Sequence, residues 1–365
     1  MTTLPEKIVL FDLDDSLHEA EEHLFDYGWN HVLRPWGYLW RKKGDLGEED
    51  LIAVSEDQRP GIGVRPKLVA KHFIRVLGMS LDDIDEERLI KLGFKHHDEL
   101  MVLKRKGSKL SPEELEAEFT NIIEKERIRY FVEKIRSEGI IPLDGYQIIP
   151  QLHEAGIKVG IVTNASLQIA TMVLEKLGFI QYEETDGALK IKSILIDVIV
   201  SGGMPEEPKP SPAPLEMANF IIRWKSLGNE QRNAIKVRLS DNEALERVRR
   251  IHLTPWEQRK THEGESLTAQ EKRDLRRKLF GMFTDKPSAM FGDSGSDVKA
   301  ASSYGIPIII VRRSQYSDEQ SLRKLGATHI VTSFAEITPL MLLGESSVTL
   351  ASVEGSPRKL PGLER

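Results

Sequence analysis

The sequence predicts an α/β fold in which a parallel sheet is covered by helices. Short apolar segments alternate with stretches long enough for a helix, which is the pattern of a parallel sheet with helical crossovers. The predicted strands span residues 7–12, 157–163, 196–201, 288–292 and 306–311. The second and fifth of these are apolar almost throughout, as strands buried on both faces of a parallel sheet must be. Polar groups follow the first four strands, at the carboxyl ends where open α/β sheets bind ligands.

The first predicted strand runs directly into two carboxylates, Asp12 and Asp14, in the sequence FDLDDS. Residues two apart on a strand point to one side, so both side chains can converge on one phosphorus atom. Asp12 is the candidate nucleophile, and Asp14 is the candidate acid and base that protonates the leaving oxygen and then activates water. A carboxylate nucleophile suits a chain without cysteine. The alternative interpretation of Asp12 and Asp14 is that they lie in a solvated turn after the strand and have no catalytic role.

The next two motifs offer phosphate-binding groups. Thr163 and Asn164 follow the second strand and could bond phosphate oxygens through the hydroxyl and backbone amides, although such a pair is also typical of a strand end or a helix cap. Lys209 follows Ser201 in the sequence EPKPSP, where flanking prolines restrict the backbone. We expect Lys209 to balance the charge of the nucleophile and the phosphoryl group. Without the other motifs, Lys209 would be interpreted as a surface lysine in a proline-rich loop.

The fourth motif, GDSGSD, contains the acidic pair Asp293 and Asp297, and its first glycine permits an abrupt turn after the strand. Magnesium favours oxygen ligands and is usually held by one or two carboxylates plus substrate phosphate. We therefore expect a Mg²⁺ site with Asp12 and Asp293 as carboxylate ligands. Asp297 is expected to orient a ligand water or Lys209 instead of binding the metal, or else to cap the following helix.

The ordered set FDLDDS, IVTN, EPKPSP and GDSGSD resembles the four motifs of the haloacid dehalogenase-like (HAD) superfamily. The resemblance implies a Rossmann-like parallel core with an α-helical cap inserted between the first and second motifs, as in phosphoglycolate phosphatases and 5'-nucleotidase-like members. It also implies that the backbone carbonyl of Asp14 is a third metal ligand. Family members commonly carry Thr at the position of Ser16, and serine keeps the hydroxyl for phosphate binding. Asp15 is expected to lie outside the metal site, and His18 to be solvated or capping.

About 145 residues separate the first two motifs, far more than one crossover helix needs. The segment reads helical throughout, with predicted helices at 19–36, 64–77, 81–103 and 112–137, and 41–63 as an additional loop or flap. Ser111 followed by Pro112 is a good helix start.

The segment between Lys209 and Asp293 is also longer than the family resemblance leads us to expect. Residues 219–286 carry 16 Lys and Arg against 10 Asp and Glu and are predicted to form a basic helical insertion. The expected organisation is a core of residues 1–17 and 142–344, a cap of 18–141, and a disordered tail of 345–365.

Composition excludes several classes of function. The chain has 365 residues and no cysteine, so disulfides, thiolate metal sites and cysteine nucleophiles are ruled out. No apolar stretch reaches the length of a membrane span, and we expect a cytoplasmic protein without membrane contact. The formal net charge of −6 argues against blanket nucleic-acid binding. The oligomeric state is left open.

The resulting hypothesis is a magnesium-dependent phosphatase that hydrolyses a small phosphorylated metabolite through an aspartyl-phosphate. An aromatic set could stack on a base or sugar and so favour a nucleoside monophosphate, although a role in the cap's own core is the favoured interpretation. Phosphoglycolate and a sugar phosphate are left open as substrates. The set comprises Tyr27, Trp29, Trp36, Tyr38 and Trp40. The alternatives are a phosphomutase, and an idle or moonlighting protein that binds RNA or a protein through the basic insertion.

Overall fold

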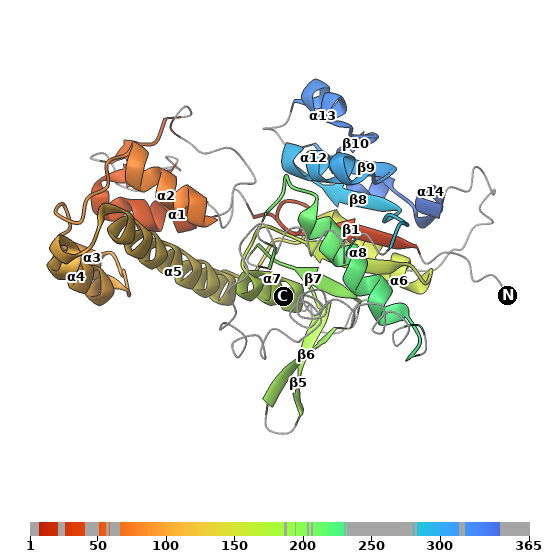
Figure 1. The fold of residues 1–365 in the computed structure, drawn as a ribbon, viewed down its shortest axis with the longest axis horizontal. Coiled ribbons are helices and arrows are strands. Elements are labelled where there is room, and N and C mark those ends of the chain that lie inside the picture. Colours follow the sequence, from red (N-terminus) through yellow and green to blue (C-terminus); the bar gives the residue numbers. More distant parts are fainter. Residues whose placement is uncertain are drawn as a thin grey trace, which may run out of the picture.

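The computed structural model describes the chain in stretches that Figure 1 shows in ribbon form. These are residues 7–20, 26–40, 51–55, 58, 66–185, 188–193, 195–202, 204–205, 207–229, 231, 280, 283–313 and 318–343. No helix within these stretches combines the length and the apolar character that a membrane crossing requires. Most of the predicted basic insertion, and the predicted tail of 345–365, lie outside the described residues.

A six-stranded sheet forms the centre of the fold, in the order β10-β9-β8-β1-β4-β7. All neighbouring pairs are parallel, which confirms the predicted fold class. The strands are β1 (Ile8–Phe11), β4 (Lys158–Val162), β7 (Val198–Val200), β8 (Ala289–Gly292), β9 (Ile308–Arg312) and β10 (His329–Val331). Only β10 was not predicted. It is a three-residue edge strand with partly exposed side chains, so its sequence lacks the apolar run that marks a buried strand.

Helices cover both faces of this sheet because successive strand residues point to opposite sides. Ile8 and Leu10 belong to a core cluster with residues of α8 and α12, whereas Val9 and Phe11 belong to a second cluster with residues of α6 and α7. The helices around the sheet are α6 (Ile148–Glu154), α7 (Leu167–Lys176), α8 (Ala213–Ser226), α12 (Gly295–Tyr304), α13 (Glu319–Leu325) and α14 (Pro339–Leu343). All four side chains of β1 are fully buried, so the first motif leaves the sheet from a completely enclosed strand.

Two features differ from the prediction between the second and fourth motifs. α8 continues to Ser226 and packs on the sheet, so a basic insertion cannot begin at residue 219. An unpredicted antiparallel hairpin joins β5 (Ile180–Thr185) and β6 (Ala188–Ser193). Asp186 and Gly187 stand between the two strands in the sequence, and this pair is a strong hairpin signal that the prediction overlooked.

The segment between β1 and β4 contains inserted helices that extend away from the sheet (Figure 1). They are α1 (Asp26–Leu33), η2 (Arg34–Trp36), α2 (Pro66–Val76), α3 (Glu86–Lys91), α4 (His97–Lys106), η4 (Gly107–Lys109) and α5 (Pro112–Glu138). The prediction of one helix at 81–103 is wrong. Gly93 adopts a left-handed φ of 72° and ends the helical path between α3 and α4.

The segment also contains strands, which the helical pattern outside the loop or flap predicted at 41–63 did not indicate. A short parallel pair joins β2 (Tyr38–Leu39) to β3 (Ile52–Ala53). Glu19 is not helical either, because its N–H donates to the carbonyl of Ile141, 2.8 Å away, in the second connection to the core. The N–H of Leu143 donates likewise to the carbonyl of Leu17 at 2.9 Å. The two connections between the core and the inserted helices therefore run side by side. The domain boundaries predicted at residues 17/18 and 141/142 stay a prediction.

α5 links the inserted helices to the core. It begins as predicted, with a capping box in which the N–H of Glu114 donates to the Ser111 hydroxyl and the N–H of Ser111 donates to the Glu114 carboxylate. Phe119 in its first half packs in the cluster of the inserted helices. Phe131 in its second half packs in the core cluster that contains Leu13 and Leu17. One helix thus spans two hydrophobic cores.

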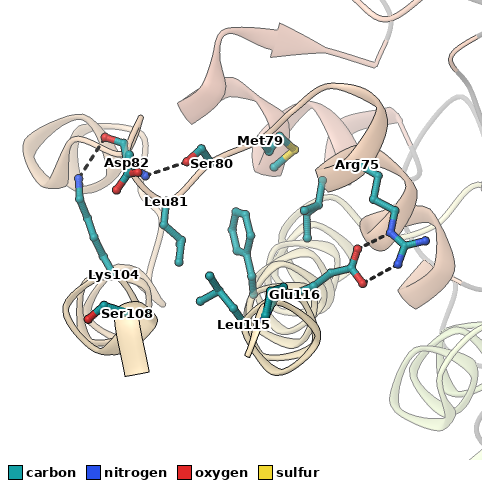
Figure 2. Close-up of a pocket in the computed structure, with 13 residues that line it drawn as sticks. Arg75, Met79, Ser80, Leu81, Asp82, Lys104, Ser108, Leu115 and Glu116 are labelled. Carbon is teal, nitrogen blue, oxygen red and sulfur yellow. Dashed lines mark hydrogen bonds and ion pairs between the residues drawn. The ribbon is translucent and has the colours of Figure 1, made fainter. Parts of the chain in front are cut away.

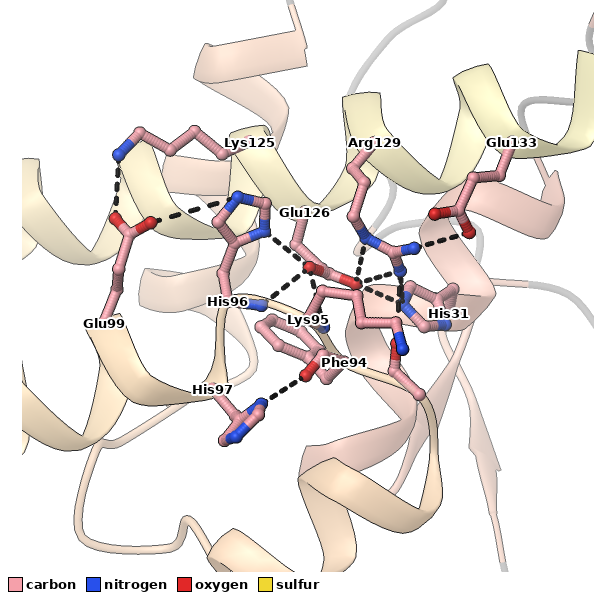
Figure 3. Close-up of polar contacts among 11 residues, drawn as sticks. His31, Phe94, Lys95, His96, His97, Glu99, Lys125, Glu126, Arg129 and Glu133 are labelled. Atoms are coloured by element: carbon pink, nitrogen blue, oxygen red, sulfur yellow. Dashed lines mark hydrogen bonds and ion pairs between the residues drawn. The ribbon is translucent and has the colours of Figure 1, made fainter.

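A buried carboxylate, Glu126 of α5, ties the inserted helices together (Figure 3). It accepts hydrogen bonds from His31 of α1 at 2.8 Å, from His96 Nδ1 at 2.6 Å, and from the backbone N–H groups of Lys95 and His96 at 3.1 Å. Arg129 Nε donates to it at 3.0 Å. Desolvation raises the pKa of Glu126, but the bonds from His31, Arg129 and His96 outweigh it and hold the pKa well below its usual range. Glu126 is therefore a charged hub that fixes α1 and the start of α4 on α5.

The predicted aromatic set builds the core of the inserted helices, which confirms the favoured interpretation. Trp29 and Trp40 are buried edge-on against Phe73. Trp36 Nε1 donates to the carbonyl of Ser80 at 2.9 Å, and the Tyr38 hydroxyl donates to that of Leu77 at 3.3 Å. These four side chains pack against other residues of the inserted helices or form hydrogen bonds with them. The side chain of Tyr27, the fifth member, lies outside the described residues.

Candidate active site

Parallel strand register brings the first, second and fourth motifs to one edge of the sheet. Phe11 of β1 is level with Ile161 of β4 and with Phe291 of β8, so the residues that follow these strands emerge together. The ladder continues past the strand end, since the N–H of Asp12 donates to the carbonyl of Phe291 at 2.8 Å. The structure therefore places Asp12, Thr163 and Asp293 at neighbouring carboxyl ends, as the sequence predicted.

Lys209 reaches this edge from the loop after β7. Its Nζ donates to Asp12 Oδ1 at 2.6 Å, to Asp297 Oδ1 at 2.6 Å and to the carbonyl of Val162 at 2.8 Å. The residue is 3% exposed, so it is a buried cation between two buried carboxylates and not a surface lysine. Asn164 fixes the backbone of Lys209, accepting from its N–H and donating to its carbonyl, each at 3.2 Å. The predicted charge-balancing lysine is thus in contact with the predicted nucleophile.

Asp297 holds Lys209 from α12. Its second oxygen accepts from the Ser294 hydroxyl at 2.5 Å and from the Ser294 N–H at 3.2 Å, so both carboxylate oxygens are occupied. Gly292 makes room for this side chain, because a Cβ there would lie 2.5 Å from the Cβ of Asp297. This arrangement agrees with the expectation that Asp297 orients Lys209.

The carboxylates of Asp12, Asp293 and Asp297 form a group that fits a metal ion. One oxygen of each lies within 4.8 Å of the others. Burial, then the charge of Asp297, raise the pKa of Asp12 to about 8 although Lys209 opposes them. Desolvation and the charges of Asp297 and Asp12 also raise the pKa of Asp293 well above its usual value.

A single lysine does not balance this concentration of negative charge. In the described part of the chain the side chain of Asp293 accepts no hydrogen bond, and Lys209 takes only one oxygen of Asp12. An oxygen-only donor set with excess negative charge suits Mg²⁺. Asp12 and Asp293 would hold the ion, whereas Asp297 is already committed to Lys209 and Ser294.

The substitution Asp293→Asn tests the role of Asp293 as a metal ligand through stability, with no measurement of enzymatic activity. A carboxylate whose pKa is raised in the folded state costs stability as the pH rises through that pKa. We therefore expect the metal-free variant to melt at a higher temperature than the wild type at pH 8. Mg²⁺ at 100 times its Kd should stabilise the wild type by about 2.7 kcal/mol. At one fixed Mg²⁺ concentration the stabilisation should be larger at pH 8.5 than at pH 6, because protons compete with the ion for the carboxylates and raise its Kd at low pH. Differential scanning calorimetry measures both effects.

The variant should lose most of the Mg²⁺ response. Asp83→Asn, which removes an exposed carboxylate of the inserted helices, is the matched control and should respond as the wild type does. A wild-type magnesium response in Asp293→Asn would contradict the metal site.

Asp14 lies beside these groups with its side chain 37% exposed, where it can exchange protons with a ligand or with water. His18 shares a 3.1 Å hydrogen bond with its carboxylate through Nε2. The expectation that His18 is solvated is wrong. It is fully buried because the first motif pairs there with the second connection, through bridges to Asp14 and Pro142. The buried ring of His18 is therefore in contact with the Asp14 carboxylate and limits its orientation.

The remaining predicted residues take different places. Asp15 turns the chain with a left-handed φ of 51°, and its carboxylate accepts from the N–H of Ala20 at 2.9 Å. The Thr163 hydroxyl accepts from the N–H of Ala165 at 2.9 Å. Ser16 is fully buried, and its hydroxyl has no hydrogen-bond partner among the described residues. Phosphate binding by Ser16, Thr163 and Asn164 stays a prediction.

A pocket of about 600 Å³ lies within the inserted helices and not beside the carboxylates (Figure 2). Ile74 of α2 and Leu115 and Phe119 of α5 give it an apolar wall, and the ion pair of Arg75 with Glu116 borders it. It contains none of the predicted site residues.

Comparison with known families agrees with the motif pattern. The model of the haloacid dehalogenase-like hydrolases matches residues 6–218, which is more than half of the chain. No curated protein matches the sequence.

Solved structures with a related arrangement include a hydrolase from Pseudomonas syringae, which is 16% identical, with 93% of this chain and 96% of that chain covered and a TM-score of 0.45. CbbY from Rhodobacter sphaeroides in complex with phosphate is 18% identical, with 91% and 96% covered and a TM-score of 0.45. A β-phosphoglucomutase from Clostridium difficile is 13% identical, with 93% and 96% covered and a TM-score of 0.42.

Proposed function

Because the chain belongs to the haloacid dehalogenase-like hydrolases, we propose that it is a magnesium-dependent phosphatase acting on a small phosphorylated metabolite. The observation that carries the proposal is the contact of Lys209 with Asp12 and Asp297 at the carboxyl ends of the strands. It joins a candidate nucleophile, a fixed cation and a group of carboxylates that could hold a metal ion in one buried place. These are the elements that phosphoryl transfer requires, because its catalysis is mostly positioning and charge stabilisation.

In the first step a carboxylate oxygen of Asp12 attacks phosphorus, and the bond from phosphorus to the leaving oxygen breaks. Asp14 donates its proton to that oxygen, so the alcohol leaves neutral and Asp14 becomes a carboxylate. Lys209 stabilises the charge that spreads over the transferring group. Mg²⁺ bound by Asp12 and Asp293 would favour the ionised nucleophile and neutralise phosphate charge.

In the second step water attacks the phosphorus of the aspartyl-phosphate. Asp14 takes a proton from this water, the acyl phosphate bond breaks, and Asp12 returns to its carboxylate form with release of inorganic phosphate. The hydrogen bond from His18 keeps Asp14 in one orientation for both proton transfers.

The inserted helices support a small substrate, on the proposal that they form a cap over the strand ends. An enclosed site excludes bulk water and polymers from the reacting atoms. The division into cap (18–141) and core (1–17 and 142–344) belongs to the same proposal.

A metabolite screen tests the function. Purified protein is incubated with nucleoside monophosphates, sugar phosphates and phosphoglycolate, with Mg²⁺ or with EDTA, and inorganic phosphate is measured. We expect phosphate release that requires Mg²⁺. Isomerised sugar phosphate without phosphate release would support the phosphomutase alternative, and full activity in chelated buffer would contradict the metal requirement.

Asp14→Asn should lower kcat by about 10²–10⁴-fold, since general acid and base catalysis is lost. The reason is chemical, because Asn can neither protonate the alcohol nor activate water. With p-nitrophenyl phosphate, whose leaving group needs little protonation, stopped-flow measurement should give a burst of p-nitrophenol followed by slow turnover.

Asp15→Asn is the matched control at the adjacent position, because Asn tolerates the same left-handed backbone. It should stay within a few-fold of the wild type. An Asp14→Asn variant as active as this control would refute the acid and base role.

A further inference from the structure

His97, the first residue of α4, has one ring nitrogen that is held by the backbone and one that is not. Its Nδ1 lies 2.8 Å from the carbonyl oxygen of Phe94 (Figure 3). A carbonyl only accepts hydrogen bonds, so Nδ1 carries the proton of this bond, and in the neutral ring Nε2 is an acceptor. Among the described residues no donor reaches Nε2, whose nearest charged neighbour is the carboxylate of Asp98.

Two carboxylates lie around this imidazole. One ring nitrogen of His97 and one oxygen from each of Glu86 and Asp98 lie within 4.8 Å of one another. Nε2 is the available nitrogen, because Nδ1 is bonded to Phe94, and Asp98 Oδ1 is 3.6 Å from it. In the described part of the chain neither carboxylate forms an ion pair with a lysine or an arginine. Three acceptor atoms thus converge without a donor between them, which is the arrangement that a cation stabilises.

The type and spacing of these ligand atoms suit Zn²⁺. The ion binds imidazole nitrogen at about 2.0–2.1 Å and carboxylate oxygen at about 2.0–2.2 Å. Tetrahedral ligands at these distances are about 3.4 Å apart, so the three atoms need to approach one another by at most about 1.4 Å. A histidine whose other ring nitrogen donates to a backbone carbonyl has the usual orientation of a zinc ligand. Mg²⁺ prefers oxygen ligands and gains little from imidazole.

We infer that Glu86, His97 and Asp98 bind a zinc ion, with water as the fourth ligand. This site is independent of the proposed phosphatase function, because α3 and α4 lie at the end of the inserted helices that is remote from the sheet (Figure 1). Glu86 begins α3, whereas His97 and Asp98 begin α4, beyond the break at Gly93. The bound ion would therefore tie the two helices together across this break.

Isothermal titration calorimetry with Zn²⁺ tests the site on the full-length protein. The protein is stripped with EDTA and dialysed at pH 7.5 into excess Mg²⁺, which occupies the predicted site at the strand ends. We expect the wild type to bind one equivalent of Zn²⁺ despite this Mg²⁺. Loss of a hydrogen-bond partner of a metal ligand weakens binding by about 10- to 100-fold. Loss of a ligand itself, in Glu86→Gln, His97→Gln or Asp98→Asn, should raise the Kd by at least about 100-fold.

Two matched controls remove the same kinds of side chain outside the group. Glu87→Gln changes the exposed neighbour of Glu86, and His153→Gln removes an exposed histidine of α6. Both should bind Zn²⁺ as the wild type does. Glu86→Gln and Asp98→Asn alter exposed carboxylates, so without zinc they should melt close to the wild-type temperature. Their loss of zinc binding would then not be caused by unfolding.

NMR spectra that correlate ring protons with ring nitrogens identify the zinc-binding atom. The chain contains 10 histidines, and the ring signals missing from His97→Gln are those of His97. Zn²⁺ should shift its Nε2 signal while Nδ1 keeps its proton. Four results would overturn the inference: no zinc binding by the wild type, a wild-type Kd in both Glu86→Gln and Asp98→Asn, coordination through Nδ1, or a doubly protonated His97 ring that Zn²⁺ leaves unchanged. In the last case a proton would be the cation that the group holds.

Discussion

Asp12→Asn is expected to reduce phosphate release by at least about 10³-fold, because an amide cannot form the acyl phosphate. The substitution keeps the shape of the side chain and leaves Lys209 with Asp297 as a partner. The loss should therefore appear in kcat with any phosphate ester. Steady-state kinetics with the best substrate of the screen measures it.

Circular dichroism must show that the variant is folded. Asp83→Asn, on the surface of the inserted helices, serves as the control and should have wild-type kinetics. Retention of more than a few per cent of activity in Asp12→Asn would remove Asp12 from the role of nucleophile.

Lys209→Met should have the largest effect on stability. It leaves Asp12 and Asp297 buried without their cation, and breaking a buried pair from one side costs about 3–5 kcal/mol. Urea unfolding at pH 8 in metal-free buffer measures the change. Lys209 also lowers the pKa of Asp12, so its loss lets the carboxylate protonate more readily. The deficit is thus expected to be largest at pH 8 and to shrink as the pH falls towards 5.5.

Two comparisons sharpen the Lys209 experiment. Lys299→Met removes an exposed lysine of α12 and should change stability little. Adding Asp297→Asn to Lys209→Met should recover part of the lost stability, because fewer unpaired carboxylates remain buried. A deficit that is independent of pH and of Asp297 would indicate that the methionine fails to pack, and would contradict the electrostatic explanation.

The core of the site follows from the sequence because strand geometry imposes it. Asp12, Thr163 and Asp293 come directly after apolar strands, and parallel strands in register bring such positions to one edge. Lys209 required its motif context, since a lysine between prolines has no preferred partner. Its contact with both Asp12 and Asp297 depends on the loop after β7, which no periodicity predicts.

The connections and the inserted helices are harder to predict because their determinants are distant in sequence. His18 is buried by pairing with Pro142, far along the chain. Glu126 gathers His31 and His96 from other helices, yet in the sequence it is one acidic residue in a charged helix. The break at Gly93 was missed because apolar residues continue with helical spacing on both sides of it.

Arg127 illustrates the same limit within α5. Its sequence neighbours, Glu126 and Arg129, take part in an ion pair, and Arg127 reads as another member of that charged pattern. Only the packing of Trp29 and Phe131 around it reveals a cation without a carboxylate partner among the described residues.

The central claim is that the phosphoryl group passes through Asp12, and borohydride trapping tests it most directly. Enzyme in steady-state turnover with Mg²⁺ and substrate is quenched and treated with sodium borohydride, which reduces an acyl phosphate of aspartate to homoserine. Peptide mass spectrometry then locates the product. We predict homoserine at position 12 in the wild type, more of it in Asp14→Asn, whose phosphoenzyme breaks down slowly, and none without substrate. Phosphate release with no homoserine at position 12 in either protein, or with reduction at another carboxylate, would contradict the account.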